Sequence, residues 1–369
     1  MNVLLLAANR QSFSNVEAIG LNLKQELPDL NLYFLNTQEL YKQYYALDHQ
    51  ITPLQISLKK KTTSSFYLSG WLGKIRMVLA TRSAIKKTPN IFDVVIAGDL
   101  GVLEYLAISS IQRDSQVYFI QDAILLWKEK RDLKKKIRHV LYGFKSRFSK
   151  CDLLFCSGEV TRKNLISSGA EPTRTFAVGI PRFDEVKYSS KKPKGSYTLL
   201  VIGEAYSWHG LSELEEKQNA FFEFIDEWGR NNDVNILVRK HPRDFNEYDY
   251  KSIQFIDGTK ESLQESIAKC NVTLSYALPS TVMFEIVKDR IPVLYIKDKD
   301  VDYRKMECNE IFFDLFYWID DYNSLNFSHI QKALEFRYKE KNIEQFISVQ
   351  DSSHNIINKI INDIASRNE

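Results

Sequence analysis

The chain has 369 residues and a formal net charge of +3, with 44% hydrophobic and 26% charged residues. This length favours two domains, and the composition is that of a folded globular protein, which excludes a disordered chain. No apolar run approaches the roughly 18 residues that a membrane-spanning helix needs, and the four cysteines lack the spacing of a zinc site or a disulfide framework.

The first half of the chain alternates short apolar runs with helical patterns. Residues 1–8 lack a basic segment and soon turn polar, so they predict a first strand and not a signal peptide. With cysteines expected to be reduced and buried, we expect a cytoplasmic protein. The predicted strands are 3–8, 32–35, 94–97, 117–120, 153–156 and 175–178, and the predicted helices are 13–27, 68–85, 101–111 and 161–168. This alternation predicts a parallel sheet.

A polar run rich in Lys, Ser, Pro and Gly at 187–197 predicts a linker, after which the pattern starts again. The predicted strands are 197–202, 234–238, 272–275 and 293–296, and the predicted helices are 213–229, 261–268, 280–288 and 352–366. The fold class is therefore α/β, with two doubly wound domains facing a cleft. We expect domains at 1–186 and 198–345, with residues 346–369 packing across the domain junction as an amphipathic helix.

A basic motif follows the predicted strand 234–238. It reads Arg239-Lys240-His241-Pro242, and Pro242 stops the strand. Ligands bind at the carboxyl ends of strands in open α/β sheets, so these side chains are candidates for a phosphate site. The alternative is a strand-end turn in which His241 caps the backbone.

A second motif, residues 279–285, places Ser280 and Thr281 directly before a helix that carries Glu285. Free N–H groups at a helix N-terminus, together with hydroxyls, form an anion site. The alternative is an ordinary helix whose first turn is capped by Ser280.

Together these motifs resemble those of bacterial surface-polysaccharide transferases of the GT-B fold, which carry a His-Pro motif. The group includes capsule Kdo and sialic acid transferases and CDP-glycerol glycerophosphotransferases. The resemblance implies two Rossmann-like domains, with a donor nucleotide held in the second. It also implies that Lys240, His241, Ser280 and Thr281 contact donor phosphate, with Arg239 and Pro242 beside them, and that Glu285 holds a ribose hydroxyl.

Two further stretches belong to the same resemblance. Gly203 and Glu204 follow the strand 197–202, and the loop continues through His209, in a region that faces donor and acceptor in this fold. Residues 178–184, Val-Gly-Ile-Pro-Arg-Phe-Asp, resemble a stretch of the glycerophosphotransferases. Their alternative is a hinge with a fixed proline turn and an Arg–Asp pair.

An inverting transfer needs a base that reaches the acceptor hydroxyl. Asp122 is the first candidate and Asp99 the second, because each follows a predicted strand of the first domain. Retaining transferases of this fold pair two glutamates eight positions apart, but Ala277 stands eight positions before Glu285, which favours inversion. The candidate acceptor contacts are Asn9, Arg10, Ser12 and His209.

No metal or other cofactor is expected. Asp298, Asp300 and Asp302 alternate in a polar loop, which we interpret as a solvated acidic turn and not as a metal site.

The positive charge is unevenly distributed. Residues 54–92 contain eight Lys or Arg and no acidic residue, and residues 128–150 contain ten Lys or Arg against two acidic residues. Such clusters favour an anionic partner. We expect a membrane surface or a lipid-linked glycan and no nucleic acid, which would place the protein at the inner face of the plasma membrane. The alternative is a solvated basic face.

The sequence thus predicts an inverting, metal-independent glycosyltransferase that uses a nucleotide-activated donor, with a CMP-sugar favoured, to extend a bacterial surface glycan. Three alternatives stay open: a polyol-phosphate transferase that uses CDP-glycerol or CDP-ribitol, a non-hydrolysing UDP-sugar 2-epimerase, and a non-catalytic nucleotide-sugar-binding subunit.

Overall fold

The computed structural model divides the chain into two compact units. The first contains Met1–Asp184 and Phe346–Glu369, and the second contains Glu185–Gln345. The structure describes residues 1–7, 10–36, 47–54, 83, 92–98, 100, 107–109, 111, 115–121, 124, 148, 150–184, 187–190, 195–206, 211–306, 309–348 and 351–368.

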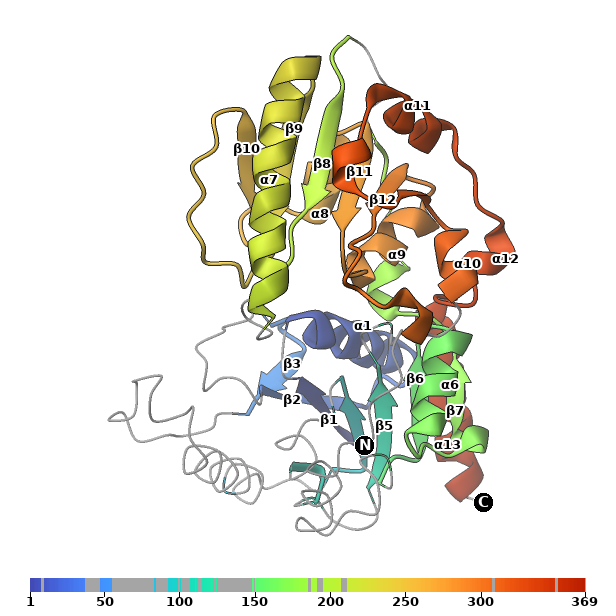
Figure 1. The fold of residues 1–369 in the computed structure, drawn as a ribbon. Helices are drawn as coiled ribbons and strands as arrows, with labels where there is room; N and C mark the ends of the chain where they lie inside the picture. The colour runs from blue at the N-terminus through green and yellow to red at the C-terminus, as the bar shows by residue number, and fades with distance from the viewer. Residues whose placement is uncertain are drawn as a thin grey trace. The chain divides into compact units, whose positions relative to one another are not determined.

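The first unit is built on a parallel seven-stranded sheet in the order β3-β2-β1-β4-β5-β6-β7 (Figure 1). The strands are β1 (Asn2–Ala7), β2 (Asn31–Asn36), β3 (Ile51–Pro53), β4 (Val94–Ala97), β5 (Gln116–Ile120), β6 (Leu153–Cys156) and β7 (Thr175–Ala177). Its described helices include α1 (Arg10–Glu26) and α6 (Glu159–Ser167). The central strands β1, β4 and β5 are buried along almost their whole length, which is why they read as continuous apolar runs.

The last helix, α13 (Ser352–Asn368), completes the core of the first unit. Ile356, Ile357 and Ile360 are buried in one cluster with residues of α1, β1 and β4. The stripe of isoleucines therefore has its apolar partner within this unit. The expectation that the helix also lies across the domain junction stays a prediction.

The segment before the second unit fixes the start of α13. Asp184 accepts hydrogen bonds from the Ser352 N–H at 3.1 Å, the Ser353 N–H at 2.7 Å and the Ser353 hydroxyl at 2.8 Å. Gly179 has φ +101°, and a Cβ at this position would lie 2.0 Å from the Ser352 Oγ. In the structure, the stretch 178–184 thus anchors the C-terminal helix, a role that the sequence did not reveal.

The second unit contains a parallel six-stranded sheet in the order β10-β9-β8-β11-β12-β13. The strands are β8 (Thr198–Ile202), β9 (Asn235–Lys240), β10 (Ile253–Asp257), β11 (Val272–Tyr276), β12 (Val293–Ile296) and β13 (Tyr317–Ile319). The helices are α7 (Ser212–Asn232), α8 (Leu263–Ala268), α9 (Thr281–Lys288), α10 (Asn309–Phe313), α11 (Phe327–Glu335) and α12 (Glu340–Ile343). The prediction of two parallel α/β domains is confirmed.

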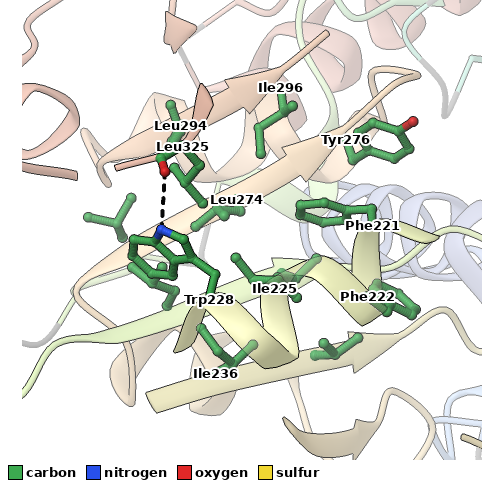
Figure 2. Close-up of a cluster of buried hydrophobic side chains, with 14 of the residues drawn as sticks. Phe221, Phe222, Ile225, Trp228, Ile236, Leu274, Tyr276, Leu294, Ile296 and Leu325 are labelled. Carbon is green, nitrogen blue, oxygen red and sulfur yellow. Dashed lines mark hydrogen bonds between the residues drawn. The ribbon is translucent and has the colours of Figure 1, made fainter. Parts of the chain in front are cut away.

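The core of the second unit lies where α7 covers the sheet (Figure 2). Phe221, Ile225 and Trp228 of α7 pack against alternate residues of β8, β9 and β11, as the helical and strand periods require. The Trp228 Nε1–H donates to the Leu325 carbonyl oxygen at 3.1 Å, which satisfies its buried polar atom.

The observed elements agree with the prediction in the centre of each sheet and differ from it at the edges. The edge strands β3, β10 and β13 and the helices α10, α11 and α12 were not predicted. Cys151, Cys156 and Cys270 are free and buried, as expected, and Cys308 lies outside the described residues. The predicted helices 68–85 and 101–111 fall largely on residues that the structure does not describe. In the part of the chain that is described, no helix is both long and apolar enough to cross a bilayer.

Candidate functional site

The order of the second sheet places a switch point between β8 and β11. The chain leaves β8 through α7 toward β9 on one side, whereas β11 leads through α9 to β12 on the other. Ile202 is level with Arg239 of β9 and with Ser275 of β11 in the register of the sheet. The residues just beyond these three strands therefore share one edge, which is where α/β sheets bind ligands.

The loop after β8 is fixed by backbone contacts. The Gly203 N–H donates to the Arg239 carbonyl oxygen at 3.0 Å, and a Cβ on Gly203 would lie 3.1 Å from that oxygen. The side-chain amide of Gln218, on α7, both donates to the Glu204 carbonyl oxygen and accepts from the Glu204 N–H, each at 2.9 Å. Glu204 is therefore held with a defined backbone orientation. No motif in the sequence pointed to Gln218, which is almost fully buried.

The Glu204 side chain lies at the N-terminus of α9. The nearby Ser280 hydroxyl favours the charged form of its carboxylate. Desolvation by the surrounding protein has the larger effect and raises the pKa of Glu204 to about 7. Glu204 and Ser280, which the sequence assigned separately to the donor site, thus lie close together at the switch point.

Ser280 is the cap of α9. It accepts a hydrogen bond from the Val282 N–H at 3.2 Å, and Thr281 is the first residue of the helix. Both residues are only half-buried. The first turn of a helix has N–H groups without intrahelical partners and carries partial positive charge, so this end of α9 favours an anion.

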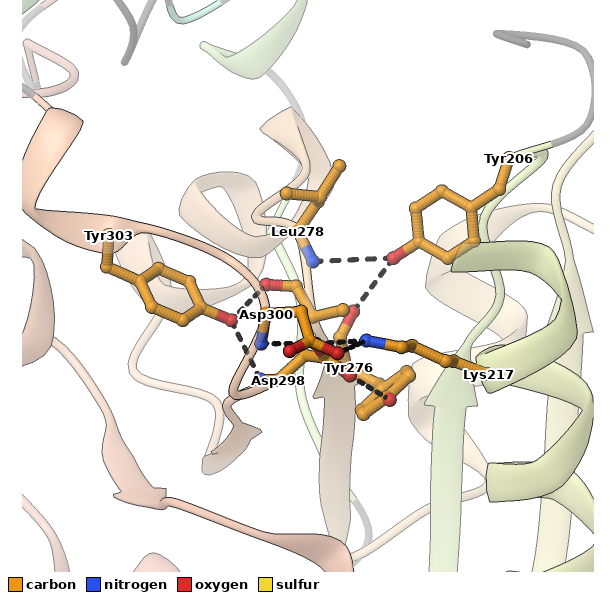
Figure 3. Close-up of polar contacts among 8 residues, drawn as sticks. Tyr206, Lys217, Tyr276, Leu278, Asp298, Asp300 and Tyr303 are labelled. Atoms are coloured by element: carbon orange, nitrogen blue, oxygen red, sulfur yellow. Dashed lines mark hydrogen bonds and ion pairs between the residues drawn. The ribbon is translucent and has the colours of Figure 1, made fainter. Parts of the chain in front are cut away.

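A buried polar network holds the turn between β11 and α9 (Figure 3). The Tyr206 hydroxyl donates to the Tyr276 carbonyl oxygen at 3.0 Å and accepts from the Leu278 N–H at 3.3 Å. Ala277 adopts φ +61°, and its carbonyl oxygen accepts from the Tyr303 hydroxyl at 2.6 Å. These bonds stabilise a backbone conformation that is costly for a residue other than glycine. The start of α9 is therefore held in a fixed position.

The acidic loop after β12 belongs to the same network, and one expectation about it was wrong. Asp298 is buried, accepts from Lys217 at 2.8 Å and from the Tyr276 hydroxyl at 2.6 Å, and is not solvated. Asp300 also pairs with Lys217, whereas Asp302 pairs with Arg304 and Lys305. Among the residues that the structure describes, no cluster of three potential metal-ligating side chains is found.

His241 follows β9 at the same edge and is half-buried. Its Nδ1 accepts the Arg243 N–H at 3.1 Å, so the neutral ring carries its proton on Nε2. The ring can therefore offer an N–H donor to an anionic ligand. Its bond to the Arg243 backbone is also what the alternative interpretation, a capping histidine, predicts.

The neighbouring basic residues face other partners. The Arg239 guanidinium donates to the carbonyl oxygens of Ser262 and Gly258 and, at 2.9 Å, to the Ser266 Oγ. Lys240 donates to the Asn246 carbonyl oxygen and lies over the Tyr248 ring. Pro242 is exposed. The observed contacts of Arg239 and Lys240 stabilise loops, and their contact with donor phosphate stays a prediction.

Glu285 lies one turn along α9 from Thr281 and accepts a hydrogen bond from the Tyr188 hydroxyl. The Tyr188 N–H also donates to Asp289, the C-cap of α9, at 2.6 Å. The start of the predicted linker is therefore held against this helix. The chain returns to the same helix before it leaves the unit, because the Tyr338 hydroxyl donates to the Val287 carbonyl oxygen at 2.7 Å. The sequence gave no signal for Tyr188, and the ribose contact of Glu285 stays a prediction.

The residues predicted to act as the base or to contact the acceptor are mostly not described. Asn9, Asp99, Asp122 and His209, the side chain of Arg10, and nearly all of the basic segments 54–92 and 128–150 lie outside the described part of the chain. Ser12 is fully buried against Gly98, where a Cβ would lie 2.7 Å from the Ser12 carbonyl oxygen. This placement favours a packing role for Ser12, and its contact with an acceptor stays a prediction.

Solved structures with a similar fold include an epimerase, a polymerase and a glycotransferase. The UDP-GlcNAc 2-epimerase from Neisseria meningitidis, bound to UDP-GlcNAc, is similar with TM-score 0.59 and 13% identity over 98% of this chain and 100% of that chain. The wall teichoic acid polymerase TagF with CDPG gives TM-score 0.60 and 13% identity, covering 100% and 90%. The glycotransferase of kitacinnamycin gives 0.59 and 9%, covering 98% of each.

These identities establish a shared fold and no more. Neither the protein-family models nor the curated protein sequences contain a match to this chain.

Proposed function

We propose that this protein is an inverting glycosyltransferase that takes its sugar from a nucleotide-activated donor bound to the second unit. The observation that carries the proposal is the preorganised edge at the switch point, where Glu204, Ser280 and His241 gather beyond three neighbouring strands. Hydrogen-bond donors fixed there offset the charge that develops on a departing phosphate. No metal is needed in this scheme.

The mechanism assigns each group a task. The free N–H groups of α9 and the hydroxyls of Ser280 and Thr281 bind the donor phosphates. The His241 Nε2–H donates to the leaving phosphate oxygen. A carboxylate of the first domain, Asp122 or Asp99, removes the proton from the acceptor hydroxyl. A CMP-sugar is the favoured donor and a bacterial surface glycan such as capsule or O-antigen the favoured acceptor, with attachment to an anionic membrane through the basic segments.

Two further activities fit the same edge. A polyol-phosphate transfer from CDP-glycerol or CDP-ribitol is supported by the similarity to the wall teichoic acid polymerase, and a UDP-sugar 2-epimerase activity by the similarity to the epimerase over nearly the whole chain. An epimerase needs no acceptor, which separates it from both transferases. A nucleotide-sugar-binding subunit without activity would share the donor site alone.

One experiment separates these candidates. The purified protein is incubated with UDP-GlcNAc alone, and with CMP-sialic acid, CMP-Kdo, CDP-glycerol or CDP-ribitol in the presence and absence of a glycan acceptor. We expect release of CMP from a CMP-sugar that depends on acceptor. Conversion of UDP-GlcNAc without acceptor would establish the epimerase, and acceptor-dependent release of CMP from CDP-glycerol or CDP-ribitol the polyol-phosphate transferase. Stabilisation by a nucleotide without turnover would leave a binding subunit.

A further inference from the structure

The first turns of α7 hold several loops at the carboxyl edge of the second sheet. Lys217 donates to Asp298 at 2.8 Å, in the loop after β12. Glu215 accepts from the side-chain amide of Asn246, in the loop after β9. Gln218 binds the loop after β8. One short stretch of this helix therefore connects three of the loops around the switch point.

Gln218 has the contacts that best define a single loop conformation. Its side-chain amide accepts from the Glu204 N–H and donates to the Glu204 carbonyl oxygen, each at 2.9 Å. The Gln218 side chain is only 3% exposed, so solvent has little access to replace these bonds if they are lost. Two bonds to one residue fix both the position and the orientation of the Glu204 backbone.

The Glu204 backbone leads directly to the residue that holds the turn before α9. Tyr206 lies two residues further along, and its hydroxyl contacts the Tyr276 carbonyl oxygen at 3.0 Å and the Leu278 N–H at 3.3 Å (Figure 3). Ser280, the cap of α9, follows this turn. A displacement of Glu204 therefore shifts the contacts that hold the start of α9.

We infer that Gln218 is a positioning residue for nucleotide binding at this edge. It holds the Glu204 loop, and through Tyr206 the start of α9, in the arrangement that binds a phosphate, and it does not itself contact the ligand. The inference rests on the proposed function in one respect, the presence of a nucleotide at these strand ends. It does not depend on the base, on the sugar or on transfer to an acceptor.

Gln218→Met tests the inference, because methionine has a similar volume and can form neither bond. At a temperature at which the variant is folded, its affinity for a nucleotide should fall by about tenfold, as it would if the loop were correctly placed in one molecule of ten. In the empty protein, amide hydrogen exchange at residues 203–206 should become faster. Gln218→Asn keeps the amide on a shorter side chain and should lose about threefold in affinity. This milder variant decides the question if Gln218→Met does not fold.

Asp226 provides a matched control on the same helix. It is also buried, and it accepts from the Ser252 N–H at 2.7 Å and from the Ser252 hydroxyl at 2.6 Å. Ser252 directly precedes β10, so this contact lies at the amino edge of the sheet, away from the switch point. Asp226→Leu should lower the melting temperature, as Gln218→Met does, but should leave nucleotide affinity within about twofold of the wild type.

Calorimetric titration with CMP, CDP and UDP provides the measurement, and the nucleotide that binds the wild type most tightly is used for the variants. The proposed donor is tested separately, by acceptor-dependent release of CMP from a CMP-sugar. If UDP binds and the cytidine nucleotides do not, the proposal of a CMP-sugar donor fails, and titration of Gln218→Met with UDP still decides the inference.

Two results would overturn the inference and leave the proposed function standing. Folded Gln218→Met could bind as the wild type does, or Asp226→Leu could lose as much affinity as Gln218→Met. A loss of affinity without faster exchange at residues 203–206 would also overturn it, because the loop would then not be what Gln218 holds. A loss confined to the Gln218 variants, in a protein that releases no CMP from CMP-sugars, would support the inference and reject the proposed function. If no nucleotide binds the wild type, both are rejected.

Discussion

In the proposed mechanism, His241 serves both the backbone and a ligand. Its Nδ1 accepts the Arg243 N–H, so the donor of the neutral ring is the Nε2–H. Asparagine at this position keeps an acceptor near Nδ1 but has no group at the place of Nε2. Glutamine reaches the place of Nε2 but leaves the Arg243 N–H without its partner. The two substitutions therefore separate the structural role from the functional one.

We expect His241→Asn to fold normally and to lose on the order of 10² in transfer rate, because one preorganised phosphate partner is removed. His241→Gln should retain more activity despite lower stability. Steady-state kinetics and thermal unfolding of both variants provide the measurement. Wild-type turnover in folded His241→Asn would show that His241 only caps the turn.

Glu204 should make stability depend on pH. Its pKa in the folded protein, about 7, lies above the ordinary value of 4.5. The favourable contribution of the neutral carboxyl is thus fully present below about pH 4.5 and is lost as the pH rises through 7. Glu204→Gln should match the wild type in melting temperature at pH 5 and exceed it by about a few degrees at pH 8.5. Equal melting temperatures at pH 8.5 would contradict the raised pKa.

The base is a prediction from the sequence alone. Asp122→Asn cannot accept a proton, so donor binding should persist while the rate of transfer falls by roughly 10²–10⁴. Nucleotide titration and single-turnover kinetics distinguish these effects. Activity in Asp122→Asn together with inactive Asp99→Asn would transfer the role to Asp99, and activity in both would exclude this step of the mechanism.

At the scale of elements, the anchor of α13 can be tested by two glycines. Gly179 and Gly195 both have positive φ, but only Gly179 faces a neighbour, Ser352. Gly195→Ala should cost about 1–2 kcal/mol from backbone strain alone. Gly179→Ala should cost several kcal/mol, because the added Cβ also displaces α13. Urea unfolding of the two variants compares these costs. If both variants lose the same free energy of unfolding, Ser352 moves away from the added Cβ without further destabilisation.

The sequence predicted the buried central strands and missed three of the four edge strands, β3, β10 and β13. The central strands β1, β4, β8 and β11 are buried along almost their whole length, so they were evident. The edge strand β10 is partly exposed and its polar residues mask the pattern, whereas β13 has only three residues. Ser280 could be predicted as the start of α9 because its cap and helix are adjacent in sequence. The contacts of Gln218 with Glu204 and of Tyr188 with Glu285 join distant segments, which no local pattern records.

For the whole molecule, the two units differ in how the chain builds them. The second unit is continuous from Glu185 to Gln345, whereas the first needs residues from both sides of it. A fragment of residues 185–345 should therefore fold alone and unfold cooperatively. A fragment of residues 1–184 should be unstable, because it lacks Ile356, Ile357 and Ile360 from its core. Circular dichroism and thermal unfolding of both fragments test this, and a cooperative transition in residues 1–184 would contradict it.

The anchoring of α13 by Asp184 also has a consequence for synthesis on the ribosome. All of the second unit is translated after Asp184 and before Ser352 and Ser353, the residues that Asp184 binds. Domains generally fold from the N-terminus onward during translation, but here the unit that begins first is completed last. Until α13 emerges, the first sheet exposes the apolar surface that those isoleucines cover, and during this interval the nascent chain is most exposed to aggregation and to chaperones.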